Sequence, residues 1–255
     1  MDGEDTFSIV KSVARSLGIV HVSVADPQAW SSDPIVSETI DKESRPLSIM
    51  PCARSVIVLG IPVQETILDT APSIWYNHLY NTVNSMLDQA AERIALELGI
   101  LGYEAVYIPR DGYFGLAGLR KKPESFFSHR HSAYLAGYGT FGWNSMLITP
   151  DHGPRMRFVS IITDAVLPLS EPMKEDVCIR CGKCVKKCPA KALSPSDYPS
   201  THTDKAACID TNETLVKEGT TPCGICIAVC PVGKTKKSVT PEEDSTDMIK
   251  SFTKS

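Results

Sequence analysis

The chain has 255 residues, of which 42% are hydrophobic, and its formal net charge at pH 7 is −4. This composition can supply a hydrophobic core, so we expect one large domain, or one domain with a small appendage, and not an intrinsically disordered chain. The acidic balance gives no broad basic surface of the kind that holds a nucleic-acid backbone by releasing counterions. We therefore do not expect nucleic acid as a partner.

Neither a membrane span nor a secretory signal is expected. The sequence contains no run of 18 apolar residues, and residues 1–5 are acidic where a secretory signal needs positive charge ahead of an apolar stretch. We therefore predict a cytoplasmic location. Thiols stay reduced in that compartment, so clustered cysteines bind metal more often than they form disulfides.

The first quarter of the chain predicts a helix, a strand, a long loop and a second strand. Residues 5–17 carry apolar side chains at helical spacing and are followed by Gly18, which predicts a helix. Residues 19–24 alternate as a strand does. The polar, proline-bearing residues 26–50 predict a loop, and the β-branched residues 55–61 predict a buried strand in the centre of a sheet.

A long helix is predicted next, over residues 73–98, because apolar side chains recur there every three or four positions and Gly99 offers a stop. The rest of this half predicts further strands at 103–108, 146–149 and 157–163 and a glycine-rich irregular segment at 109–127. This order predicts an α+β fold, with a mixed α/β sandwich that binds cofactor and substrate over residues 1–170. A cluster-binding domain is expected over 171–240, and the acidic tail over 241–255 is expected to be disordered.

Eight of the nine cysteines lie in one block towards the C-terminus. Cys178, Cys181, Cys184 and Cys188, followed by Pro189, form the C-x2-C-x2-C-x3-C-P run of bacterial-type ferredoxins. In such runs three thiolates hold one [4Fe-4S] cluster and the fourth ligates the other. The run therefore predicts two clusters whose function is to move low-potential electrons.

A second, looser set supplies the complementary ligands, with 14 residues between its first two members, and consists of Cys208, Cys223, Cys226 and Cys230. Exchange of the fourth ligand predicts one cluster on Cys178, Cys181, Cys184 and Cys230, and the other on Cys188, Cys208, Cys223 and Cys226. Gly182 and Gly224 are expected to relieve the tight turns of the two motifs.

Zinc is the alternative metal, since pairs of cysteines two residues apart also serve structural zinc sites. A zinc ribbon does not require the longer C-x2-C-x2-C-x3-C-P run, so we favour iron-sulfur clusters. The ninth cysteine, Cys52, is interpreted as a small buried apolar residue rather than a reactive thiol. Because about 170 residues precede the block, the clusters are expected to serve another site.

A glycine-rich segment ahead of the cysteines carries a resemblance to a known family. Its pattern is AG.G..G.NS.LI.P..G...R, and the residues that form it here are Ala136, Gly137, Gly139, Gly142, Asn144, Ser145, Leu147, Ile148, Pro150, Gly153 and Arg157. Together with a downstream two-cluster block, this pattern resembles the epoxyqueuosine reductase and reductive dehalogenase superfamily. The resemblance covers residues 100–232 well, and the first hundred residues in general shape.

The resemblance implies a nitroreductase-like α/β domain, similar to the vitamin B12 processing protein, followed by a bacterial-type two-cluster ferredoxin domain. It further implies a corrinoid such as cobalamin, with one cluster near the cobalt and the other taking electrons from a donor such as ferredoxin or flavodoxin. The sequence resembles a short form of the family without the helical-repeat extension that recognises tRNA. Epoxyqueuosine is therefore not the expected substrate, and the missing export signal counts against a respiratory role.

Glycines permit close backbone approach to a large planar ring, so the predicted cofactor wall consists of Gly137, Gly139, Gly142, Asn144, Ser145 and Arg157. The alternative is that the glycines only shape a tight loop. A corrinoid reduction needs a proton donor and a cation that stabilises developing negative charge. Candidates for these two roles are Tyr134, Tyr138 and His131 as donors and Arg155 as the cation. The family's acidic donor stretch is not reproduced, although Glu124 lies close to its place.

The sequence therefore predicts an iron-sulfur oxidoreductase that passes electrons through two [4Fe-4S] clusters to a bound corrinoid, which reduces a small substrate. The alternative is a non-enzymatic electron-transfer protein that reduces or activates a partner, such as a corrinoid protein. A corrinoid carrier and a flavin in the α/β domain are further possibilities. Lysines around the cysteine motifs suit an acidic electron donor in each case, and they are Lys183, Lys186, Lys187, Lys234, Lys236 and Lys237.

Overall fold

The computed structural model describes residues 2–110, 115–122, 125–200 and 202–234, and a four-stranded antiparallel sheet organises them. The strands follow the order β1 (His21–Ala25), β2 (Ser55–Pro62), β6 (Met156–Thr163) and β3 (Ala105–Ile108). The β2 and β6 strands have neighbours on both sides and pair over their full length. Their nearly continuous apolar sequences are buried because both faces of the sheet are covered.

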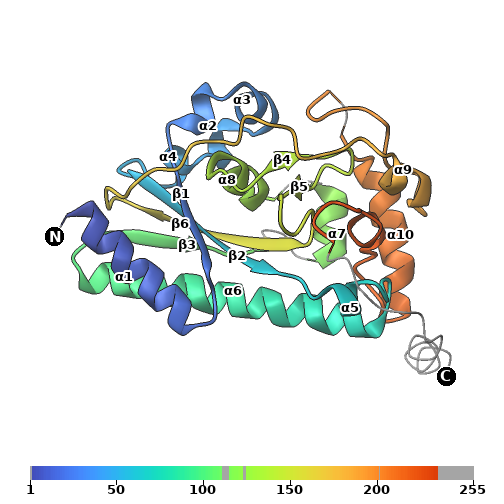
Figure 1. Ribbon diagram of the computed structural model, residues 1–255, viewed down its shortest axis with the longest axis horizontal. Coiled ribbons are helices and arrows are strands. Elements are labelled where there is room, and N and C mark those ends of the chain that lie inside the picture. The colour runs from blue at the N-terminus through green and yellow to red at the C-terminus, as the bar shows by residue number, and fades with distance from the viewer. Residues whose placement is uncertain (1, 111–114, 123–124, 201, 235–255) are drawn as a thin grey trace.

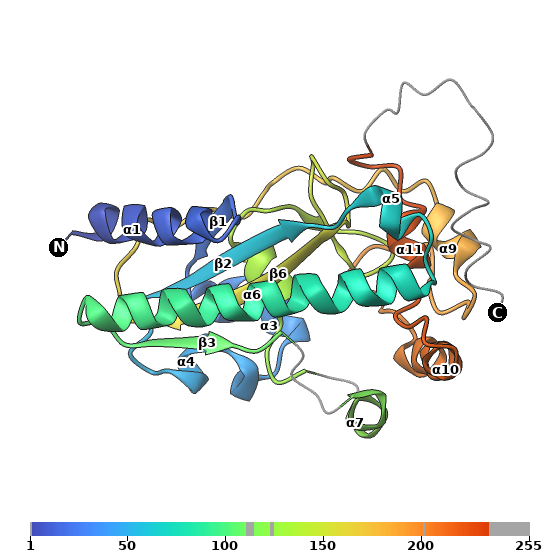
Figure 2. The same ribbon diagram turned by 90° about the horizontal axis from the view of Figure 1, so that it is seen from below.

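One face of the sheet packs against α1 (Gly3–Ser16) and α6 (Ile74–Ile100), which lie across it in Figures 1 and 2. Alternate strand residues point to this side, so Ile57 and Leu59 of β2 join a buried cluster with Leu87 of α6. The α6 helix begins at Ser73, whose hydroxyl accepts a hydrogen bond from a backbone N–H of the first turn.

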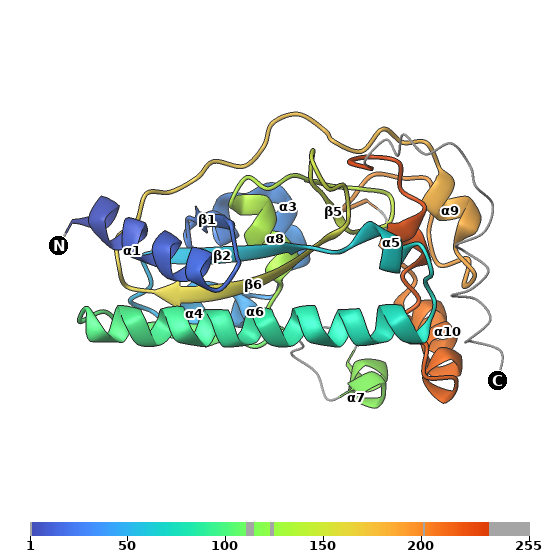
Figure 3. The same cartoon turned by 60° about the horizontal axis from the view of Figure 1, so that its bottom comes forward.

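The opposite face is covered by α8 (His129–Leu135) and by a group of short helices, as Figure 3 shows. These short elements are α2 (Ala29–Ser32), α3 (Pro34–Thr39), the 3-10 helix η1 (Lys42–Ser44) and α4 (Pro46–Ile49). Val56 and Val58 of β2 point to this side and pack with Trp30 and Ala133. The first part of the chain is therefore a sandwich of helix, sheet and helix layers.

The cysteine block forms the end of the molecule opposite the N-terminus (Figure 1). It contributes α9 (Lys183–Lys187), α10 (Lys205–Lys217) and α11 (Ile225–Ala228). The elements that lead to it from the sandwich are α5 (Glu65–Leu68), α7 (Gly115–Lys121), β4 (Thr140–Phe141) and β5 (Leu147–Ile148). A small buried cluster of Val63, Leu68, Tyr76 and Ala228 joins the two parts.

The predicted helices at 5–17 and 73–98 and the predicted strands are confirmed, and β2 is an interior strand as expected. The predicted α+β class, with a ferredoxin-type part after the sandwich, is confirmed as well. The boundary near residue 170 stays a prediction, and the tail over 241–255 lies outside the described residues. In the part of the chain that the structure describes, no helix is long and apolar enough to cross a membrane.

Three local predictions are wrong. Residues 26–50 contain four short helices, and in two of them, α3 and α4, Pro34 and Pro46 occupy the first turn, where proline needs no N–H partner. The α6 helix continues through Gly99, and the left-handed residue after it is Gly102. The segment predicted to be irregular contains α7.

Candidate iron-sulfur and cofactor site

The first predicted ligand set lines a cavity at the surface of the cysteine block. About 350 Å³ of space, including a part open to solvent, lies between Cys178, Cys181, Cys184 and Cys230 and the side chains of Trp143 and Ile148. Burial raises the pKa of the Cys184 thiol, and the neighbouring thiols of Cys178, Cys230 and Cys181 raise it further. The four thiols are therefore close together, although the sequence separates Cys230 from the rest.

The second set is gathered in the same way but lies deeper. Burial raises the pKa of the Cys226 thiol to about 12, and Cys223, Cys208 and Cys188 add to that shift in this order. The eight cysteines thus form two groups of four. These are the groups predicted if each motif exchanges its fourth ligand with the other. Which thiol ligates which iron stays a prediction.

The chemistry of both groups suits iron-sulfur clusters. Each offers four soft thiolates and no imidazole or carboxylate, and iron would displace the thiol protons on binding. Among the described residues, no three His, Cys, Asp or Glu side chains are arranged to hold a single metal ion. Gly182 and Gly224 both adopt a left-handed conformation, with φ of 69° and 68°, directly before α9 and α11, as their place in the motifs predicts.

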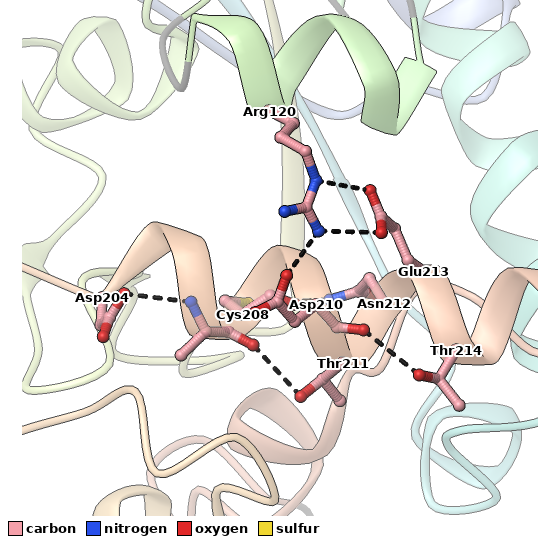
Figure 4. Close-up of polar contacts among 9 residues, drawn as sticks. Arg120, Asp204, Cys208, Asp210, Thr211, Asn212, Glu213 and Thr214 are labelled. Carbon is pink, nitrogen blue, oxygen red and sulfur yellow. Dashed lines mark hydrogen bonds and ion pairs between the residues drawn. The ribbon is translucent and has the colours of Figure 1, made fainter.

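Asn212, which the sequence analysis did not single out, connects two ligands of the second set across the 14-residue insertion. Its Nδ2 donates to the backbone oxygen of Cys208 at 2.8 Å, and its Oδ1 accepts from the backbone N–H of Cys223 at 3.0 Å. The insertion itself forms α10, which Figure 4 shows with Asn212 beside Cys208. No spacing rule indicates such a residue, because its second partner lies 11 positions away.

The same helix is held to the sandwich side by ion pairs to α7. Arg120 donates through Nε and Nη2 to the two carboxylate oxygens of Glu213, at 2.9 and 2.8 Å, and also contacts Asp210 (Figure 4). These side chains are substantially exposed, so the pairs position α7 beside α10 and add little stability.

The three glycines of the predicted cofactor wall are packed against the chain itself. A Cβ atom at Gly139 would overlap the carbonyl oxygen of Ile148, and one at Gly137 would lie 2.5 Å from the carbonyl oxygen of Glu171. A Cβ at Gly142 would lie 2.8 Å from the Ile148 side chain. The alternative interpretation, that these glycines shape a tight loop, accounts for all three, and their contact with a corrinoid stays a prediction.

Replacing Gly139 by alanine is therefore expected to destabilise the protein by roughly 3 kcal/mol, because the added methyl group forces the backbone of β5 to move. Urea unfolding of the anaerobically prepared protein measures this change. Gly99→Ala is the matched control, since nothing lies within 4 Å of a Cβ there and alanine gains about 0.5–1 kcal/mol within a helix. Equal unfolding midpoints for the two variants would contradict the packing argument.

Asn144 and Ser145 lie where the sandwich meets the second cysteine group. The Asn144 side chain is 5% exposed, donates to the backbone oxygen of Cys226 at 3.2 Å and accepts from the N–H of Met146. Ser145 has a φ of 53°, and its carbonyl oxygen accepts a hydrogen bond from Arg130. Both residues therefore join the glycine segment to the cluster motif, whether or not a cofactor also touches them.

His131 is a weak candidate for a proton donor in this environment. Its side chain is 2% exposed, and burial lowers its pKa to about 3, with the Arg130 guanidinium lowering it further. The imidazole is therefore neutral near pH 7. Its Nε2 lies 3.0 Å from the Tyr198 hydroxyl, and its Nδ1 lies 2.7 Å from the Ser128 hydroxyl, so both nitrogens hold the local structure together.

The two candidate tyrosines differ in what their hydroxyl groups contact. Tyr134 donates to a carboxylate oxygen of Asp33 at 3.3 Å, and partial burial next to Asp33 raises its pKa to about 12. Tyr138 donates to the backbone oxygen of Val58 in β2 at 3.2 Å, and burial raises its pKa above the usual value. Both hydroxyls therefore keep their protons near pH 7.

Arg155 is 1% exposed, and its guanidinium binds backbone oxygens at the end of the second cysteine motif. Its Nη1 donates to the backbone oxygen of Cys230 at 2.9 Å, Nη2 donates to that of Val232, and Nε lies 3.7 Å from a carboxylate oxygen of Glu65. The geometry indicates a clamp on Cys230 rather than a cation available to a substrate.

Arg157 of β6 is the better-placed cation, and it contacts a polar stripe on α6 that sequence analysis missed, made up of Tyr76, Tyr80 and Asn84. Its guanidinium lies 4.0 Å from the ring centre of Tyr80, and its Nε donates to the side-chain oxygen of Asn84. One turn back along α6, Tyr76 packs against Gly224, and its pKa of about 12, raised by burial, also responds to the charges of Arg157, Tyr80 and Cys226. The stripe therefore runs from the second cysteine group into the sandwich.

The side-chain amide nitrogen of Asn84, in the same stripe, has no hydrogen-bond acceptor. Asn84 is 1% exposed, and its Nδ2 donors have no acceptor although the side-chain oxygen is engaged by Arg157. A buried amide donor without a partner costs about 1–3 kcal/mol, so such an atom suggests a missing ligand. The sequence signal that could have indicated this stripe is the four-residue spacing of Tyr76, Tyr80 and Asn84. It lies within an otherwise apolar helical pattern.

Two further predictions concern Cys52 and Glu124. Cys52 is exposed, with its sulfur 3.5 Å from a carboxylate oxygen of Glu104, so its interpretation as a buried apolar residue is wrong. It follows Pro51 in a surface turn ahead of β2. Glu124, the residue near the family's acidic donor, lies outside the described residues.

Comparisons with known proteins agree with this geometry. A family model described as a 4Fe-4S dicluster domain matches residues 177–234, so two [4Fe-4S] clusters are the cofactors of the cysteine block. The tetrachloroethene reductive dehalogenase of Desulfitobacterium hafniense is 28% identical over 201 residues, which is 71% of this chain and 33% of that protein. The epoxyqueuosine reductase of Pseudomonas aeruginosa is 22% identical over 211 residues, covering 72% of this chain and 54% of that protein.

Solved structures of both kinds share the fold. The catabolic reductive dehalogenase NpRdhA aligns with a TM-score of 0.70 at 20% identity, over 92% of this chain and 32% of that one. An epoxyqueuosine reductase in complex with a tRNA stem loop aligns with a TM-score of 0.58 at 19% identity, over 91% and 67%. Since that relative binds tRNA, the expected absence of a nucleic-acid partner stays a prediction, as does the cytoplasmic location.

The chain spans about a third of the length of the reductive dehalogenases that it matches. Within that span it has both the glycine-rich segment and the two cysteine motifs, in the order that the sequence analysis used. The predicted resemblance to the epoxyqueuosine reductase and reductive dehalogenase superfamily is therefore confirmed.

Proposed function

We propose that this chain is an iron-sulfur oxidoreductase whose two [4Fe-4S] clusters pass low-potential electrons to a corrinoid held by the sandwich, for the reduction of a small substrate. The observation that carries the proposal is the position of the second cysteine group. Cys226 lies close to Tyr76 of the polar stripe of α6, and Tyr76 packs against Gly224 of the same motif, so an electron that leaves this group can enter the sandwich.

The direction of transfer follows from exposure. Cys181 of the first group is exposed, whereas all four cysteines of the second group are partly buried. Both groups border the glycine-rich segment, the first through Trp143 and the second through the bond between Asn144 and Cys226. A protein donor can reach the first group through Cys181. Electrons therefore enter at the first cluster and leave from the second.

The residues of the sandwich suit a corrinoid. The macrocycle is rimmed by carboxamide groups, which accept hydrogen bonds, and Asn84 offers buried amide donors without an acceptor. Arg157, whose guanidinium lies 4.0 Å from the ring centre of Tyr80, would lie beside the same ligand. When bound, a corrinoid supplies a cobalt centre that accepts the electrons and acts as a strong reductant, and a reductive dehalogenase of this fold, with a TM-score of 0.65, is described as B12-dependent.

The protein's own groups would then supply the proton and the charge stabilisation. Tyr134 keeps its proton near pH 7 because its pKa is raised to about 12, and Asp33 holds its hydroxyl in a fixed direction. Arg157 is the candidate cation for negative charge that develops on a substrate. Asn144 and Ser145 stay candidate contacts at the boundary with the second cluster.

An anaerobic titration of the reconstituted protein with cob(II)alamin tests the proposal. Iron and sulfide analysis should give about eight of each per chain, and visible and paramagnetic resonance spectra should change to those of a bound, base-off corrinoid. Asn84→Leu, which removes the amide donors at similar volume, should weaken corrinoid binding while the iron content stays the same. Glu92→Gln, an exposed change on the outer face of α6, is the matched control.

A second candidate function is a non-enzymatic electron-transfer protein that reduces a partner's cofactor. The packing of Gly137, Gly139 and Gly142 against the chain's own atoms favours it, because this packing explains the glycines without a ring. About eight irons without any corrinoid binding would support this function and exclude the first.

A further inference from the structure

Beside the first cysteine group lie lysines that form no ion pair with the residues that the structure describes. Lys183, Lys186 and Lys187 of α9 and Lys191 just beyond it are exposed. No carboxylate of the described residues forms an ion pair with any of them. The chain as a whole is acidic, with a net charge of −4, so this concentration of lysines at one cluster is not a consequence of composition.

Two other cations near the cysteine motifs, Arg180 and Lys234, do have carboxylate partners. Arg180, in the middle of the first motif, is bound by Asp176 at 2.5 Å and Asp197 at 3.0 Å. Lys234, which follows the second motif, is bound by Asp69 at 2.9 Å. Lys236 and Lys237 lie outside the described residues. The α9 side of the first cluster therefore presents four neighbouring lysines for which the described residues provide no carboxylate partner.

An apolar side chain lies at the centre of the same surface. Ile179, between Cys178 and Cys181, is 63% exposed. Its neighbour Arg180 has a φ of 53°, an unfavourable conformation for a side-chain-bearing residue, and its two carboxylate partners hold it there. This arrangement turns Ile179 outward beside the exposed Cys181. An apolar centre with a charged rim is the usual composition of a transient protein interface.

We propose that Ile179, Cys181 and the lysines at positions 183, 186, 187 and 191 form the docking surface for a small acidic electron-transfer protein whose redox centre lies near its surface. The inference rests on the proposed function, because it gives the partner of the entry cluster. Each productive encounter transfers one electron from the partner's reduced centre to the cluster of the first cysteine group. The partner is oxidised and the cluster is reduced by one electron, and no bond or proton is exchanged.

A charge-reversal variant tests the surface. In Lys183→Glu/Lys186→Glu/Lys187→Glu, the second-order rate constant for reduction by a reduced acidic ferredoxin should fall about 10- to 100-fold at low ionic strength. The affinity of the two oxidised proteins, measured by calorimetry, should fall as well, and the difference from the wild type should shrink as salt is added. A reduced acidic flavodoxin, used in parallel, tells whether the surface accepts both kinds of donor or only the iron-sulfur kind.

The control is a triple variant with the same change in net charge placed elsewhere, namely Lys11→Glu/Lys42→Glu/Lys217→Glu, whose three lysines are exposed on α1, η1 and α10. Its rate and affinity should stay within about twofold of the wild type. Equal losses in both triple variants, or no loss in the α9 variant, would overturn the docking surface. Iron content and reduction by dithionite are measured for every protein, because about eight irons per chain with normal dithionite reduction separates failed docking from failed cluster assembly.

Discussion

Replacing Cys226 by serine is expected to lower the iron content from about eight to about four atoms per chain, because it removes one ligand of the buried cluster only. Burial and the thiols of Cys223, Cys208 and Cys188 all act on this sulfur, so it lies at the centre of the second group. The first group keeps its four thiols and its cavity. Iron and sulfide analysis, with paramagnetic resonance of the reduced protein, measures the loss.

Three companion variants make this result specific. Cys181→Ser removes a ligand of the exposed cluster and should also leave about four irons, with the signal of the other cluster retained. Cys52→Ser changes the one cysteine outside the block and should leave about eight irons. Asn212→Leu removes both bonds that tie Cys208 to Cys223 and should selectively weaken the second cluster. A full iron content in Cys226→Ser would contradict the ligand assignment.

The two cysteine variants should also differ in their effect on electron flow. Cys181→Ser should block reduction by a protein donor, since the exposed cluster is the entry point in the proposed function. Cys226→Ser should still accept an electron from the donor but should not pass it into the sandwich, because the stripe through Tyr76 begins at the second group. The same defect in both variants would contradict the proposed direction of transfer.

The parts of the fold that sequence predicted well are those with a local signal. The β-branched run of β2 and the three-to-four-residue periodicity of α6 report burial directly, and the fixed spacing of the cysteines reports cluster ligation. The helices between residues 26 and 50 were missed because proline is both a loop signal and a first-turn signal. Only the cap at Asp33, which accepts from Val36, decides between the two in α3.

The site residues were harder to predict because their roles depend on distant partners. Arg155 contacts Cys230 and Val232, more than 70 positions away, and its sequence context resembles that of any strand arginine. The glycines at 137, 139 and 142 were singled out for close approach to a cofactor ring, which stays a prediction, and what approaches them in the structure is the chain itself. The sequence could not show that β5 and Glu171 of the same chain come close there, since those contacts exist only after folding.

Replacing Arg155 by methionine is expected to cost roughly 3–5 kcal/mol of unfolding free energy, the largest loss that a single side chain outside the ligands should produce. The substitution leaves the backbone oxygens of Cys230 and Val232 without their donor and leaves Glu65 beside an apolar group. A buried acceptor without a partner costs about 1–3 kcal/mol, so two of them account for most of the loss.

The same change should reach the first cluster through Cys230. Because the guanidinium fixes the backbone on both sides of Pro231, its removal should loosen Cys230 and lower the iron content towards about four, with the buried cluster retained.

Arg155→Lys keeps the charge but not the planar fork, so its stability and iron content should be intermediate. Arg120→Met, which breaks exposed ion pairs between α7 and α10, is the control and should change stability by less than about 1 kcal/mol. If Arg155→Met retained both its iron and its urea midpoint, the clamp would have no role, and the arginine would return as a candidate cation for catalysis.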